Sequence, residues 1–140
     1  MSKIYLAINN APDEQLGYVK DDGKIYRSKP GIDEHIGRVD LGSGKVYADR
    51  FGPDKVIGRV DLKNGKVFHS KFGPDEYAGA VDREGRMHRH VSMAADEYVG
   101  RTDPFLSLAH SGGGMLLLVL PALESKNHTH SDGQGQGVTE

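Results

Sequence analysis

The stretch GRVDLKNGKVF, residues 58–68, has the features of a complete β-hairpin. Two alternating segments flank Asn64 and Gly65, and a glycine accepts the positive φ that a tight reversal of the chain needs. Val60 and Phe68 thereby become candidates for a cross-strand pair. Most of the remaining chain consists of variations on this stretch, so its structure decides the fold.

The variations recur at an almost constant spacing. Similar stretches lie at residues 17–26, 37–47 and 79–88. The glycine that begins each stretch recurs about every 21 residues, at Gly17, Gly37, Gly58, Gly79 and Gly100. A fixed period of this size, carried by turn glycines and β-branched residues, is typical of stacked or ring-closed supersecondary units.

Differences in loop length between the copies support a shared register. We expect two-residue turns at residues 22–23 and 84–85, and three-residue turns at residues 42–44 and 63–65. These turns would place a valine opposite an aromatic ring in each hairpin: Val19 with Tyr26, Val39 with Tyr47, Val60 with Phe68 and Val81 with His88. The predicted buried face therefore carries the strand glycine, the valine and the ring.

The opposite face is predicted to be the wetter one. It would carry Arg38, Arg59 and the small aliphatic residues Val46 and Val67. We interpret each Arg-x-Asp pair on this face as a solvated ion pair with little effect on stability.

The two ends of the chain look like two halves of one hairpin. Tyr5 lies one period before Tyr26, and residues 96–102 repeat the first half of a hairpin. If Thr102 lies opposite Tyr5, the ends close four complete hairpins into a ring of five units, a closed antiparallel all-β barrel. The alternative is a poor fifth hairpin at residues 100–110 with residues 1–10 outside the barrel.

Short Pro-Asp turns connect the hairpins. They occur at residues 11–14, 52–55 and 73–76, and no helix separates successive hairpins. The strands should therefore be antiparallel neighbours. Phe51 and Phe72 precede two of these turns and are predicted to pack beneath them.

A ring of ten strands raises the question of what fills its interior. Eight strands already enclose enough room for side chains, so ten should leave a channel unless something enters it. Residues 111–114 read as a flexible break, and Met115–Leu123 is apolar all round. As a structural element, this run either fills the protein's own core or lies against the outside of the sheet. The functional alternatives are a dimer contact and a shallow membrane contact. The predicted organisation is a barrel over 1–110, the break and apolar segment over 111–123, and a disordered polar tail over 124–140.

Composition limits the partners of this 140-residue, single-domain chain. Its formal net charge of -2 and pI of about 6.4 do not favour a nucleic-acid ligand. It contains no cysteine, which excludes disulfides and cysteine nucleophiles. No apolar run reaches the length needed to span a bilayer, and we expect a cytoplasmic protein.

Residues suited to catalysis are few. No nucleophile elbow, carboxylate pair or zinc-binding helix motif is present, so we expect no enzymatic activity. His88 and His90 share a face at strand spacing, and His110 could approach them to form a metal site. Histidines in an aromatic position of a repeat are more often ordinary packing residues, so we predict no metal and no cofactor.

The pattern of a G-x-V strand, a turn glycine, a lysine, an aliphatic residue and a ring resembles the β-flower domains over residues 3–110. These are shallow symmetric barrels of repeated hairpins, similar in shape to the tubby C-terminal domain. The resemblance implies an apolar central channel that binds lipid or another hydrophobic molecule. Choline-binding repeats have a similar length but rely on tryptophan cages, and this chain has no tryptophan; YD repeats usually form longer arrays.

The leading hypothesis is a non-enzymatic binding module whose aromatic-lined channel takes a hydrophobic or lipid-like ligand. Its predicted ligand-binding residues are the aligned rings Tyr5, Tyr26, Tyr47, Phe68 and His88. The alternative is a structural or protein-interaction module that forms a homo-oligomer through Met115–Leu123.

Overall fold

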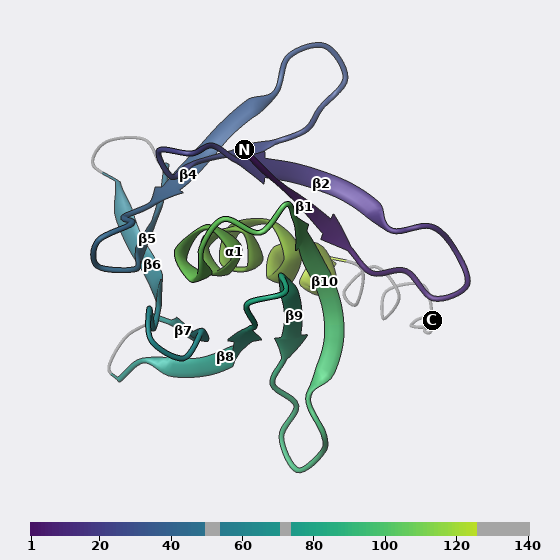
Figure 1. The fold of residues 1–140 in the computed structure, drawn as a ribbon, viewed down its shortest axis with the longest axis vertical. Coiled ribbons are helices and arrows are strands. Elements are labelled where there is room, and N and C mark those ends of the chain that lie inside the picture. Colours follow the sequence, from purple (N-terminus) through teal and green to yellow (C-terminus); the bar gives the residue numbers. More distant parts are fainter. Residues whose placement is uncertain (50–53, 71–73, 126–140) are drawn as a thin grey trace, which may run out of the picture.

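The computed structural model describes residues 1–49, 54–70 and 74–125. In this part of the chain, ten antiparallel strands form a closed barrel around a helix (Figure 1). The strands are β1 (Ser2–Leu6), β2 (Glu14–Val19), β3 (Lys24–Arg27), β4 (Glu34–Val39), β5 (Lys45–Ala48), β6 (Lys55–Val60), β7 (Lys66–His69), β8 (Glu76–Val81), β9 (Arg86–Arg89) and β10 (Glu97–Asp103). The helix begins as α1 (Leu108–Gly114) and continues as η1 (Met115–Val119). The predicted all-β barrel of hairpins is confirmed.

The two ends of the chain complete the ring. β1 pairs with β10 on one side and with β2 on the other, so the closed barrel has no free edge. We number the hairpin units β2–β3, β4–β5, β6–β7 and β8–β9 from one to four, and β10–β1 is the fifth unit. The predicted fifth unit is therefore confirmed. The alternative hairpin at residues 100–110 is wrong, because α1 begins at Leu108.

The register within each hairpin differs by one residue from the predicted register. Val39 faces Val46 rather than Tyr47, because Asp40 N donates to Lys45 O (2.8 Å) and the turn contains four residues instead of three. Each of the other turns is likewise one residue longer than predicted, and this inverts the two faces. Each ring therefore pairs with a residue of the outer surface: Tyr26 with Tyr18, Tyr47 with Arg38, Phe68 with Arg59 and His88 with Ala80. Tyr5 pairs with Arg101 and not with the predicted Thr102.

The inner face of the barrel is aliphatic. As predicted, it carries the strand glycines and the valines that follow them by two positions. It also carries Val46 and Val67, which are fully buried, so their predicted place on the wetter face is wrong. The physical reason is the longer turn, which places the residue before each ring, rather than the ring, opposite the valine.

A β-bulge interrupts the pairing next to every strand glycine. On β8, for example, Gly79 pairs with Val67 and Tyr77 pairs with Phe68, so Ala78 between them has no partner on β7, although its carbonyl oxygen accepts a bond from His90 N (2.9 Å) on the other side. A bulge of this kind bends the strand and redirects a side chain. The five residues at this bulge position are Leu16, Ile36, Ile57, Ala78 and Val99.

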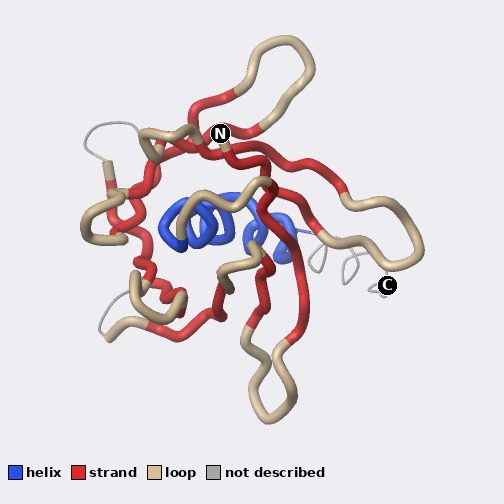
Figure 2. Tube along the Cα trace, viewed as in Figure 1, coloured by secondary structure: helices blue, strands red, loops and turns tan. Residues whose placement is uncertain are grey.

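The helix occupies the axis of the barrel (Figure 2). Leu108 to Leu120 are all buried, and residues 120–125 continue the helix out of the ring. Of the interpretations of Met115–Leu123, the core segment is correct. Residues 111–114, predicted as a flexible break, are the second half of α1.

The three glycines of α1 lie where the helix and the barrel wall are closest. A Cβ added to Gly112 would lie 2.3 Å from Val60 Cγ2, and one added to Gly114 would lie 2.5 Å from Ile4 Cδ1. A helix with side chains at these positions would not fit between the inward valines and isoleucines. These glycines therefore set the diameter of the helix where the barrel wall is closest.

The turn η1 matches the five units of the barrel one residue at a time. Its hydrogen bond from Leu120 N to Met115 O spans five residues, the pattern of a π-helix. A Cβ added to a strand glycine would lie 2.7–3.4 Å from the side chain of one residue of η1, and each of the five glycines meets a different residue. The pairs are Met115 with Gly79, Leu116 with Gly58, Leu117 with Gly37, Leu118 with Gly17 and Val119 with Gly100. Each step along the turn thus moves one unit around the ring.

Some predictions concern residues beyond those described. The packing of Phe51 and Phe72 beneath their turns lies outside the described residues. Of the tail predicted to be disordered over 124–140, residues 124 and 125 are still helical, and residues 126–140 lie outside the described residues. Within the described residues, no helix is both long and apolar enough to cross a membrane.

The fit of strand glycines around the helix can be tested with Gly37→Ala. The new Cβ would lie 2.2 Å from Tyr47 O and 2.7 Å from Leu117 Cδ1, so we expect the free energy of unfolding in urea to fall by about 1–3 kcal/mol. Gly42→Ala is the matched control, since its Cβ would meet only Asp40 Oδ1 at 3.5 Å. Equal stability of the two variants would contradict this packing.

The fit of the helical glycines can be tested with Gly112→Ala. In an exposed helix this change would stabilise by about 1 kcal/mol, whereas here we expect destabilisation because the Cβ would lie 2.3 Å from Val60 Cγ2. Val60→Ala removes that methyl group, so a double-mutant cycle of urea unfolding should show a favourable coupling of about 1 kcal/mol. Simple additivity of the two changes would count against the contact.

Candidate functional site

The outer surface of the barrel repeats a contact among an arginine, a ring and an aspartate. In the third unit, the guanidinium of Arg59 lies 4.1 Å from the centre of the Phe68 ring, and its Nε donates to Asp75 Oδ2 (2.7 Å). We call this arrangement the outer clasp. It joins two strands of one unit to the connector that leads to the next unit.

The second and fifth units repeat this clasp. Arg38 lies 3.9 Å above the Tyr47 ring and 3.5 Å from Asp54 Oδ2. The fifth unit uses the chain ends: Arg101 lies 4.0 Å above the Tyr5 ring and donates to Asp13 Oδ2 (2.7 Å). The bond to Asp13 raises the pKa of Arg101, so this guanidinium stays charged.

The first and fourth units depart from the pattern. In the first unit, Tyr18 stacks on Tyr26 with ring centres 5.3 Å apart and donates its hydroxyl to Asp33 Oδ2 (2.9 Å). In the fourth unit, Ala80 stands in the arginine position, opposite His88. The clasp is therefore closed by a tyrosine in one unit and has no long side chain in the other.

The rings predicted to line the channel lie on this outer surface. Tyr5, Tyr26, Tyr47, Phe68 and His88 are all half-buried on the side of the sheet away from the helix. A cation lies over four of these rings: Arg101 over Tyr5, Lys20 over Tyr26 (5.0 Å), Arg38 over Tyr47 and Arg59 over Phe68. Their predicted direction is wrong because of the one-residue change in register. Their role in ligand binding stays a prediction.

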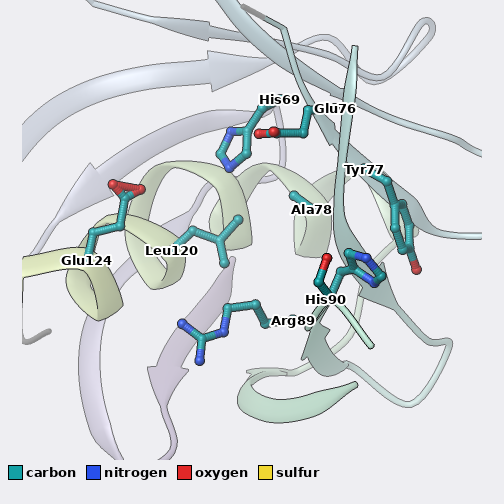
Figure 3. A pocket seen from close by; sticks show the side chains of 9 residues that line it. His69, Glu76, Tyr77, Ala78, Arg89, His90, Leu120 and Glu124 are labelled. Atoms are coloured by element: carbon teal, nitrogen blue, oxygen red, sulfur yellow. The ribbon is translucent and has the colours of Figure 1, made fainter. Parts of the chain in front are cut away.

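A cleft opens beside the fourth unit, where the helix leaves the barrel (Figure 3). Its volume is about 490 Å³. Leu120 and Ala78 form its apolar part, while Arg89, His69 and Glu124 bring charged or ionisable groups to it (Figure 3). The other lining residues are Glu76, Tyr77, His90 and Ser92.

Ala78 distinguishes this cleft from its counterparts in the other units. The bulge position holds leucine, isoleucine or valine elsewhere, and the smaller alanine leaves room above Leu120. The equivalent cleft of the first unit retains Leu16 and has a volume of about 420 Å³. The sequence contains this signal, since Ala78 and Ala80 both interrupt an otherwise regular repeat, but the prediction did not use it.

The polar groups of the cleft are held in place by neighbours. The Tyr77 and His90 rings contact each other with centres 5.0 Å apart, and His90 Nδ1 lies 3.5 Å from Asp96 Oδ1. Partial burial raises the pKa of the Tyr77 hydroxyl, and the charge of Asp96 adds to this, so Tyr77 is a neutral hydrogen-bond donor at pH 7. Arg89 Nη2 pairs with Glu97. The cleft is thus a preformed mixture of donors, charges and apolar surface.

The histidines considered for a metal site lie in three separate environments. His88 contacts Tyr98 on the outer surface, His90 contacts Tyr77, and His110 is buried in α1. His110 Nδ1 lies 2.7 Å from Ser107 Oγ, and its Nε2 lies 3.1 Å from Asp21 O. Among the described residues, no group of three or more histidine, aspartate or glutamate side chains is placed to hold a metal ion.

Comparison of the chain with protein-family models, curated proteins and solved structures finds no match.

The outer clasp can be tested through its pH dependence. Bonds from Arg59 and from Ser70 Oγ (3.1 Å) lower the pKa of Asp75 below its ordinary value of 3.8. The folded protein thus favours the carboxylate, and this contribution to stability is present above about pH 4 and is lost as the pH falls through the lowered pKa.

We therefore expect Asp75→Asn to lose less stability than the wild type on acidification. The measurement is the urea midpoint from about pH 7 to about pH 2. Arg59→Gln removes the main cause of the lowered pKa and should flatten the acid side of the curve in the same way. Curves of equal slope for all three proteins would contradict this assignment.

Proposed function

We propose that the protein is a non-enzymatic binding module whose ligand site is the cleft of the fourth unit. The observation that carries the proposal is Ala78, which opens the bulge position beside Leu120 where the other units place larger aliphatic side chains. Ligand sites are typically concave, with apolar surface and a few oriented polar groups. This cleft has both features.

The side chains of the cleft favour a small amphipathic monoanion. Its apolar part would lie on Ala78 and Leu120. Its anionic group would face Arg89, because a guanidinium carries five N–H donors and can hold a second anion besides Glu97. Glu76 and Glu124 also line the cleft and would disfavour a further negative charge on the ligand.

This proposal moves the expected hydrophobic ligand from the axis to the end of the barrel. The chain's own helix fills the axis, and its residues from Leu108 to Leu120 are buried. Five hairpin units around a central helix support a relationship in shape to the β-flower domains, and we infer that relationship from architecture alone. The filled axis removes the reason to place a lipid there.

The alternative of self-association through Met115–Leu123 loses its main support. Met115 to Val119 are buried within their own barrel and Leu120 reaches only the cleft, so these side chains do not form a surface for a second copy. Of the run, only Pro121, Ala122 and Leu123 reach the surface.

The ligand site can be tested with the dye 8-anilinonaphthalene-1-sulfonate, which has apolar rings and one sulfonate group. We expect its fluorescence to rise on binding to the wild type, and decanoate to compete with it. Ala78→Leu restores the larger side chain of the other units and should weaken dye binding by about tenfold, because it fills the apolar part of the cleft.

Leu16→Phe provides the matched control. It adds volume at the same repeat position beside the first-unit cleft, so it should leave the dye affinity unchanged. Circular dichroism of both variants verifies that the barrel remains folded. Undiminished dye binding by folded Ala78→Leu, or an equal loss in Leu16→Phe, would overturn the assignment of the site.

A further inference from the structure

We propose that the fourth unit carries an open cation site on its outer surface, which takes the guanidinium of an arginine side chain from a partner polypeptide. Three units close this position with their own arginine, namely Arg38, Arg59 and Arg101. In the fourth unit the ring and the aspartate are both present, but the arginine position holds Ala80. A cation supplied by another chain would complete the arrangement.

The ring side of this site is accessible. Ala80 is half-buried on the outer surface directly opposite His88, and its side chain ends at Cβ. Tyr98 contacts His88 from the neighbouring strand β10, with ring centres 5.6 Å apart. His88 is therefore held by a neighbour on the β10 side, while the β8 side presents only a methyl group.

The aspartate side of the site has room for a second partner. Asp96 precedes β10 as Asp54 precedes β6 and Asp75 precedes β8. Its carboxylate is exposed, and its contact with His90 Nδ1 at 3.5 Å is with a ring nitrogen and not with a guanidinium. A carboxylate has about four lone-pair sites, so Asp96 can accept a guanidinium as well.

Among the described residues, the nearby cations do not occupy the position. Arg86 pairs with Asp82 and Glu84, and Arg89 pairs with Glu97. Lys66 is exposed and lies opposite Ala80 on the neighbouring strand β7.

A lysine at this place is compatible with a bound guanidinium, as the other units demonstrate. Lys24 lies opposite Arg38, and Lys45 lies opposite Arg59. Both of those arginines nevertheless lie beside an aspartate and, in each case, over a ring. Lys66 is thus part of the same arrangement and does not replace the missing arginine.

The geometry selects arginine over lysine. A planar guanidinium can stack on a ring and donate in a fork to a carboxylate at the same time, whereas an ammonium group is a compact point charge. Exposed contacts of this kind are individually weak, so the partner is expected to be a polypeptide segment that adds further contacts around one arginine.

This site meets the cleft at His90, which lines the cleft and contacts Asp96, but the two sites would bind their ligands through different side chains. Ala80 lies on the outer face of β8, while Ala78 lines the cleft at the end of the barrel. Failure of dye binding to the cleft would leave the arginine site standing, and the reverse also holds.

The test uses N-acetyl-arginine methylamide as the probe and the full chain as the protein. We expect the probe to shift the NMR signals of the His88 ring in a saturable way. The citrulline analogue has nearly the same shape without the charge, and it should produce no saturable shift. Ala80→Arg should abolish the response to the arginine probe and raise the thermal midpoint by about 1–4 °C, because the fourth clasp is then closed from within.

Two aspartate variants separate this site from general attraction to an acidic surface. Asp96→Asn should weaken the arginine response by about two- to fivefold, while Asp54→Asn in the closed second unit should leave it unchanged. Equal responses to arginine and citrulline probes, an unchanged response in Ala80→Arg, or equal losses in the two aspartate variants would overturn the proposal.

Discussion

The structure depends on the contact between five strand glycines and five consecutive residues of the central helix. In an α-helix successive side chains point about 100° apart, which is more than the angle between neighbouring units of a fivefold ring. Consecutive residues of an α-helix would therefore not meet consecutive units. The turn from Met115 to Val119 closes over five residues, and each residue meets the glycine of the next unit. The rare helical form is thus the one that matches the symmetry of the barrel. The strand glycines leave room for it. A Cβ at any of these glycines would also lie 2.0–2.4 Å from a backbone carbonyl oxygen of a neighbouring strand.

This contact also determines where function can reside. A barrel whose axis is filled by its own buried helix offers its ends and its outer surface to partners. Both features that we assign to binding occur in the fourth unit, where Ala78 and Ala80 replace larger residues on opposite faces of β8. Departures from a repeat that is otherwise consistent are the places where selection for function is most expected.

The outer clasps explain why the rings are regular although they do not line a channel. In every unit except the fourth, the ring supports a cation or tyrosine that reaches the aspartate of the next connector, so a clasp joins neighbouring units across the outside of the barrel. Individually these exposed pairs are weak. Their repetition nevertheless accounts for the spacing that first suggested aligned functional rings.

Much of the architecture could be read from the spacing of particular residues. The recurrence of Gly37, Gly58 and Gly79 predicted the hairpin units, and the position of Tyr5 one period before Tyr26 predicted that the chain ends form a fifth unit. The direction of the rings could not be read in this way. It depends on one residue in each turn, and turns of three or four residues both fit a glycine such as Gly65 at φ +79°.

The sequence by itself therefore determined the number of units, their antiparallel order and the closure of the ring, because period and turn chemistry are local properties. Tertiary structure decided which face is buried and what fills the axis, because both follow from how the helix fits the completed barrel. The same stretch SGGG at residues 111–114 is compatible with a flexible linker or with a narrow helix, and only the walls formed by Ile4, Val39 and Val60 select the helix.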